Sequence, residues 1–118
     1  MATGKKARKG LRIHWLWANS TPTGSFNAQS VSVDLSDYGG VLILFATSDG
    51  TNLYVSSMIV LKNSVRHALV QSIPNSGTLR TRFATAEDTG VTFSTGYSGA
   101  STSTNSAVPY EIYGLRGI

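Results

Sequence analysis

Hydrophobic and polar residues alternate along much of this chain, and a period of two is typical of half-buried β-strands. Residues 11–17 are the clearest example. One face of this strand would carry Arg12, His14 and Leu16, and the other, with the spacing of a core face, Leu11, Ile13, Trp15 and Trp17. The same pattern predicts eight strands in all, at residues 11–17, 30–35, 41–47, 53–61, 65–73, 79–85, 89–94 and 108–115.

Three segments add detail to this pattern. Residues 41–47 are apolar at almost every position, as in a strand that is covered on both faces or presents one face to a partner. Asp49-Gly50 follows, and this dipeptide between two apolar runs predicts a β-hairpin. Residues 96–106, GYSGASTSTNS, lack long aliphatic side chains, which predicts a long exposed loop.

Many short strands without a helical period predict an all-β fold, and 118 residues fit one domain. We expect a single antiparallel β-sandwich, jelly-roll-like, at residues 11–118. Residues 1–10, MATGKKARKG, show no hydrophobic periodicity. We expect them to form a flexible, basic N-terminal arm.

Composition and charge change the picture in two ways. Only 14% of the residues are charged, whereas 16 are Ser and 13 are Thr, and such a surface suits protein packed among neighbours. The charge is also divided: from residue 13 onward there are five cations and six acids, whereas the start of the chain carries five cations, Lys5, Lys6, Arg8, Lys9 and Arg12. These five residues could dock on an acidic protein surface, contact nucleic-acid phosphates or simply be solvated. Aromatic residues do not alternate with them, which favours docking on protein.

No motif predicts catalysis. The chain has no cysteine, and neither His14 nor His67 has metal-ligand spacing around it. Residues 96–100 depart from the nucleophile-elbow pattern. Glu87 and Asp88 are adjacent, so in an extended segment they would point to opposite faces and could not act on one bond. We therefore expect no enzymatic activity, no metal and no cofactor.

The polar loop is the candidate ligand site, with Tyr97, Ser98 and Asn105 as its candidate residues, because an aromatic ring can stack on a sugar. The longest apolar run, residues 41–46, is too short to span a membrane. No apolar segment of the signal-peptide type follows the basic start. We expect no membrane span.

Three stretches carry a family resemblance: LWANSTP at residues 16–22, SFNAQSVSVDLSDY at 25–38 and VPYEIYGLRG at 108–117. Their arrangement resembles small virion proteins of tailed bacteriophages, in which an LW-N-P-x-x-x-F-A-A-Q-T-V-x-L-D-L-S-x-Y opening and an I-P-x-x-I-Y-G-I-K-G ending bracket a β-rich domain. The resemblance implies a structural or adhesive part of the tail, baseplate or head, often an oligomer. The basic arm is not part of that pattern.

The leading hypothesis is a non-enzymatic virion protein, assembled in the bacterial host cytoplasm, that forms a homo-oligomer with a trimer favoured. Its partners would be other virion proteins, reached through the arm. The alternative is a receptor- or carbohydrate-binding adhesin module that binds a host-surface glycan. The third hypothesis is a nucleic-acid-binding protein.

Overall fold

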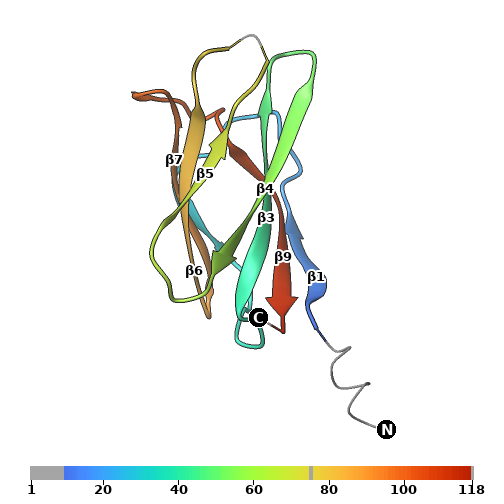
Figure 1. Cartoon of the computed structure of the whole chain (residues 1–118). Helices are drawn as coiled ribbons and strands as arrows, with labels where there is room; N and C mark the ends of the chain where they lie inside the picture. Colours follow the sequence, from blue (N-terminus) through green and yellow to red (C-terminus); the bar gives the residue numbers. More distant parts are fainter. Residues whose placement is uncertain (1–9, 75, 118) are drawn as a thin grey trace, which may run out of the picture.

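The computed structural model describes residues 10–74 and 76–117. These residues form nine strands and no helix (Figure 1). The strands are β1 (Arg12–Ala18), β2 (Gln29–Ser32), β3 (Gly40–Ser48), β4 (Leu53–Leu61), β5 (His67–Gln71), β6 (Arg80–Glu87), β7 (Gly90–Ser98), β8 (Ser101–Thr102) and β9 (Val108–Arg116). The all-β prediction is confirmed, and β8 is a short strand that the pattern did not indicate.

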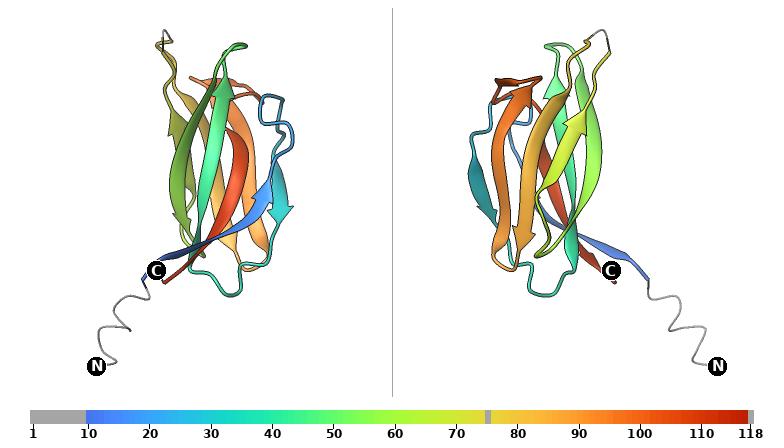
Figure 2. Two further views of the ribbon diagram at one scale, coloured as in Figure 1. Left: turned by 90° about the vertical axis from the view of Figure 1, so that its right-hand side faces the viewer. Right: turned by 60° about the vertical axis from the view of Figure 1, so that its left-hand side comes forward.

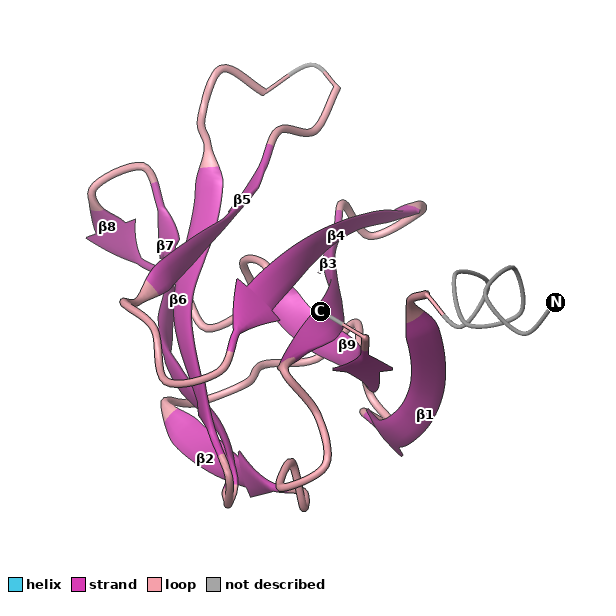
Figure 3. Ribbon diagram, turned by 60° about the horizontal axis from the view of Figure 1, so that its bottom comes forward, coloured by secondary structure: helices cyan, strands magenta, loops and turns pink. Residues whose placement is uncertain are grey.

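The strands form two antiparallel sheets that pack face to face, as the view from below in Figure 3 shows. One sheet has the order β1-β9-β3-β4, and the other has the order β2-β7-β6-β5, with β8 paired to β7. The predicted antiparallel β-sandwich is therefore confirmed. Within the sheets, β3 and β4 form a hairpin and β5, β6 and β7 form a meander. The jelly-roll connectivity stays a prediction.

The core lies between the two sheets and follows the alternation of the strands. In β3, Val41, Ile43 and Phe45 are buried, and in β9 Ile112 faces them from the neighbouring strand. The second sheet contributes Val31, Leu69, Ala84, Ala86, Val91 and Phe93. The intervening residues of each strand lie on the outer faces.

In β1, the residues that face the core are not the ones that the alternation predicts. Trp15 pairs with Tyr113 and Trp17 with Ile112, so Leu16 is the extra residue of a β-bulge. The bulge reverses the in–out alternation of the side chains along β1, so that Trp17 faces inward although Trp15 faces outward. Trp17 packs on the core, with its ring 6.2 Å from that of Phe26. The prediction that Leu11, Ile13 and Trp15 share its face was wrong, since all three are at least 50% exposed.

One arginine, Arg82 of β6, is completely buried between the sheets. A guanidinium has five N–H donors, and here each has a backbone carbonyl in reach. Nε donates to Ala107 (2.9 Å), Nη1 to Phe26 (2.9 Å) and Ser94 (2.7 Å), and Nη2 to Thr104 and Ser106 (both 3.1 Å). Burial lowers the pKa of Arg82 to about 10, so the group remains a cation at neutral pH.

The predicted loop at residues 96–106 is more ordered than expected. Residues 96–98 end β7, β8 follows, and Ser106 is completely buried. The segment folds back over Gly96, where a Cβ would collide with the carbonyl oxygens of Ser103 and Ser106. Arg82 donates to the Ser106 carbonyl and to the Thr104 carbonyl of the same segment. The prediction of one continuous exposed loop was therefore wrong, because the polar backbone here is used to satisfy a buried cation.

The predicted hairpin after β3 is confirmed, and Asp49 organises it. Its carboxylate accepts hydrogen bonds from the backbone N–H groups of Thr51 (2.9 Å) and Asn52 (2.6 Å) and from the Tyr54 hydroxyl (3.0 Å). Gly50 supplies the positive φ, +93°, that the turn requires. The bonds from Asn52 and Thr51 lower the pKa of Asp49 to about 2.

Replacing Arg82 by Met should lower the free energy of unfolding by at least about 3 kcal/mol, because each buried acceptor left unsatisfied costs about 1–3 kcal/mol. Urea unfolding of the two proteins measures this difference. Arg82→Lys, with three donors, should lie between wild type and Arg82→Met. The control is Arg66→Met, which removes an exposed guanidinium and should change stability by less than about 1 kcal/mol. Equal stability of Arg82→Met and wild type would contradict this account.

Asp49→Asn should remove part of the acid sensitivity of the fold. The unfolded chain protonates this group near its ordinary pKa of 3.8 and the folded chain near about 2. The stabilisation is therefore complete above pH 3.8 and is lost as the pH falls towards 2. Thermal unfolding midpoints at pH 2, 3, 4 and 6 should show wild type above Asp49→Asn at pH 6 and the gap narrowing towards pH 2. A gap that is independent of pH would exclude this role.

Candidate interaction surfaces

The residues considered for catalysis are engaged in local structure. His14 Nδ1 lies 3.2 Å from the Tyr38 hydroxyl, and His67 Nδ1 lies 2.8 Å from the Val65 carbonyl oxygen. Across residues 10–74 and 76–117, no three His, Asp or Glu side chains lie together in a way that could hold a metal ion. The described residues also contain no helix long and apolar enough to cross a membrane.

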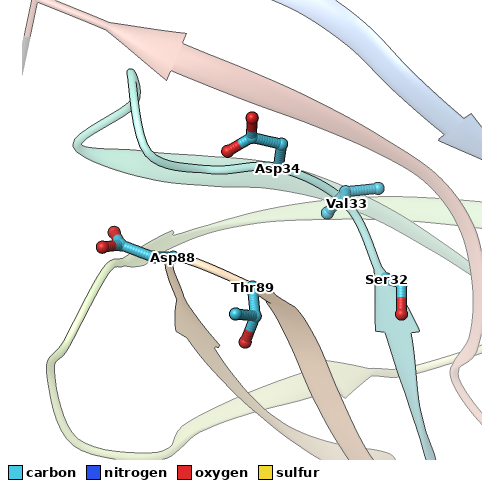
Figure 4. A pocket seen from close by; sticks show the side chains of 5 residues that line it. All are labelled: Ser32, Val33, Asp34, Asp88 and Thr89. Atoms are coloured by element: carbon cyan, nitrogen blue, oxygen red, sulfur yellow. The ribbon is translucent and has the colours of Figure 1, made fainter.

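A recess of about 350 Å³ at the lower end of the sandwich is open to solvent (Figure 4). It lies between β2 with its following connection and the β6–β7 turn, and is lined by Ser32, Val33, Asp34, Asp88 and Thr89. Lys62 closes this end, with its Nζ 2.7 Å from the Asp88 carboxylate and donating to the Leu35 carbonyl (2.9 Å). Asp34 accepts the hydroxyl and backbone N–H of Ser36, which lower its pKa. Asp88 thus links the β6–β7 turn to Lys62, whereas Asp34 holds the turn within its own connection.

Of the predicted basic docking residues, Lys5, Lys6, Arg8 and Lys9 lie outside the described residues. Arg12 is exposed at the start of β1 and pairs with Arg116 at the end of β9. Arg116 lies over the Tyr38 ring (5.3 Å) and 3.7 Å from the Asp37 carboxylate. Two guanidinium groups therefore stand at the corner of the sandwich where the described chain begins.

The three residues predicted for ligand binding do not form one site. Tyr97 and Ser98 are neighbours in β7 and point to opposite faces of the sheet, and Asn105 is exposed in the connection that leads to β9. Tyr97 instead lies beside Phe83 of β6, with ring centroids 6.2 Å apart, and the Arg66 guanidinium covers the Phe83 ring at 4.2 Å. We call these three residues the aromatic shelf. Sequence reasoning missed Phe83 and Arg66, which the β6–β7 pairing and the β4–β5 connection bring to Tyr97.

Two members of the aromatic shelf, Phe83 and Tyr97, line an open recess of about 350 Å³ together with Thr81, Gly99 and Ala100. The shelf itself combines a half-exposed phenol, a phenyl ring and a cation. Such a surface can stack a flat ring or the apolar face of a sugar and donate hydrogen bonds to its rim. It has no acid or base placed for chemistry among its lining residues.

The most extensive feature is the outer face of the β1-β9-β3-β4 sheet. Residues opposite one another in a ladder share a face, and the pairing defines three rows across the four strands. The rows are Ile13–Leu115–Gly40–Leu61, Trp15–Tyr113–Leu42–Ile59 and Ala18–Glu111–Leu44–Ser57. We call these twelve residues the apolar face. Glu111 is its single charged residue.

No other described segment lies over the centre of this sheet, and the left-hand view of Figure 2 looks directly onto it. Trp15 is 58% exposed, Ile13 50%, Leu61 48% and Ile59 45%. The all-apolar strand that the sequence singled out is β3, with one side in the core and Leu42 and Leu44 half-buried on this outer face. Residues 10–74 and 76–117 therefore cover β3 fully on one face only, and the expectation that its other face meets a partner stays a prediction.

The outer face of the other sheet is of a different kind. Its ladder of β2, β7 and β6 carries Ser30, Thr92 and Thr85 in one row, with the first two hydroxyls 2.8 Å apart. Hydroxyl groups of this kind are satisfied by water and by one another. This part of the second outer face is therefore polar, whereas Val70 and the aromatic shelf occupy other parts of the same face.

Comparisons with models of protein families, with curated proteins and with solved structures found no match. The surfaces themselves therefore carry the functional argument.

Proposed function

We propose that this chain is a non-enzymatic structural protein of a bacteriophage virion, a minor tail, baseplate or head-decoration component that oligomerises and docks on the particle through its N-terminal arm. The observation that carries the proposal is the apolar face. The resemblance of residues 16–38 and 108–117 to small virion proteins supports the virion assignment.

A continuous apolar surface on one sheet is costly to leave in water, at about 25 cal/mol per Å². Trp15 and Tyr113 stand in its middle row, on β1 and β9, and aromatic residues surrounded by few charges are characteristic of protein interfaces. The core between the sheets is complete without these side chains. Their position on the outside therefore favours contact with another protein over a role in folding.

The charge distribution supports docking through the arm. Five cations precede residue 13, whereas the remaining residues carry a net charge of −1. Arg12 and Arg116 continue the positive charge onto the corner of the sandwich. A basic segment joined to a nearly neutral domain can bind an acidic surface of a particle without attracting the rest of the domain to it.

Deleting residues 1–10 should leave the sandwich folded and abolish its incorporation into particles. The tagged full-length chain and the deletion variant are produced in infected bacteria, and virions are purified on a density gradient and probed for the tag. The matched variant replaces Lys5, Lys6, Arg8 and Lys9 by Ser at unchanged length, and should also be lost from the particles if charge is responsible. Absence of the full-length chain from particles would overturn the proposed function, and normal incorporation of the deletion variant would overturn docking through the arm.

The aromatic shelf favours a second function, binding of a host-surface glycan. Tyr97→Ala should abolish binding on a glycan array, because the stacking ring is lost, and should lower adsorption of virions that carry the variant. Thr92→Ala, on the same outer face but away from the shelf, is the control and should bind as wild type does. A wild-type array without signal, or unchanged adsorption of the Tyr97 variant, would exclude this function.

A further inference from the structure

We infer that the apolar face packs against the apolar face of a second copy of this chain, so that the two copies are related by a twofold axis. The inference rests on the proposed function, because it names the partner that one surface of an assembling protein binds. Three observations lead to a second copy: the extent of the face, its charge and the polarity of the opposite side.

The extent of the face suits a stable dimer. It spans four strands, of which β3, β4 and β9 each have nine residues. With strands about 4.8 Å apart and about 3.3 Å per residue, the whole outer side of this sheet measures about 19 by 30 Å, or about 570 Å² as a flat projection, and the three rows of the apolar face occupy about two-thirds of it. Protruding side chains such as Trp15 and Ile59 increase the area that a partner can cover. The sheet is therefore large enough for the roughly 500 Å² per partner that a specific interface should exceed.

The charge of the face permits it to meet itself. Its one carboxylate, Glu111, accepts a hydrogen bond from the Tyr113 hydroxyl at 2.9 Å within the same chain. This contact gives the carboxylate a hydrogen-bond partner before association. Glu111 stands in an end row of the face, so a twofold axis through the middle row keeps the two carboxylates apart and places no like charges in contact at the centre.

The polarity of the opposite side decides the symmetry. In a ring of three, each copy uses two different patches, so the apolar face would have to cover some other part of its neighbour. Over β2, β7 and β6 the second outer face offers hydroxyl groups at Ser30, Thr85 and Thr92, which would lose water without gaining matched partners. Its apolar side chains, such as Val70 and Phe83, lie near the Arg66 cation, which the apolar face would have to desolvate. A twofold arrangement places apolar surface on apolar surface. It therefore takes the place of the trimer expected from the sequence.

The test compares two residues that are matched in every respect except the face. Ile59 lies on the edge strand β4 and Val70 on the edge strand β5, both are β-branched, and both are 45% exposed. Sedimentation equilibrium is measured for the full chain, Ile59→Lys and Val70→Lys between about 1 and 200 µM. Wild type and Val70→Lys should reach twice the 12.5 kDa of one chain. Ile59→Lys should weaken association at least about 30-fold, because each dimer then holds two lysines where apolar side chains were buried.

Trp15→Lys, at the opposite edge of the face, is the second variant, and it should also give monomers. Circular dichroism and thermal unfolding of each variant show that the sandwich is folded. Two wild-type results would overturn the inference: a chain that stays monomeric to 200 µM, or one that reaches three times the chain mass. Dimerisation of the Ile59→Lys variant as strong as that of wild type would also overturn it.

The particle experiment separates this result from the proposed function. Full-length chain that is monomeric in solution but present in virions, and lost from them on Ile59→Lys, would overturn the second copy as partner and support another virion protein on the same face. A dimer in solution that is absent from virions would support the twofold contact and overturn the virion role.

Discussion

The buried guanidinium of Arg82 is the constraint on which the loops of this sandwich depend. A cation removed from water is strongly destabilising unless every donor is satisfied, and here the satisfaction comes from backbone carbonyls on β7, on the segment before β2 and on the segment before β9. Three stretches that are distant in the sequence must therefore converge on one side chain. The arrangement needs no buried carboxylate, and it explains why the serine- and threonine-rich segment after β7 is ordered.

Other polar ties repeat this principle away from the arginine. Gln71 of β5 accepts the Thr47 hydroxyl (2.9 Å) and donates to Ser56 Oγ (3.1 Å), so it links the second sheet to β3 and β4 of the first. Lys62 does the same at the lower end through Leu35 and Asp88. With both ends tied, the sheets are held at a fixed separation. A face that must match another surface benefits from such rigidity, because little side-chain and loop entropy is lost on association.

Period-two alternation and the Asp49-Gly50 turn were enough to predict the class of fold and most of its strands, because both are local properties of the backbone. The orientation of two strands could not be predicted in the same way. In β1, one extra residue at Leu16 turns Trp15 outward and Trp17 inward, and hydrophobicity alone does not reveal a bulge. Between residues 79 and 83, the apolar Leu79 and Phe83 alternate with arginines, and the structure places Arg82 rather than Phe83 in the core. That inversion depends on five carbonyls supplied by distant segments, which no local pattern contains.

The same two features account for the candidate surfaces. Burying Arg82 turns Phe83 outward, where it meets Tyr97 and Arg66 and forms the aromatic shelf. The bulge at Leu16 turns Trp15 outward, beside Tyr113 and in line with Leu42 and Ile59. A strand such as β3, apolar on both sides, belongs in the middle of three layers, yet the described chain supplies two. In our proposal a second copy of the chain supplies the third layer, with a surface of the same size and polarity.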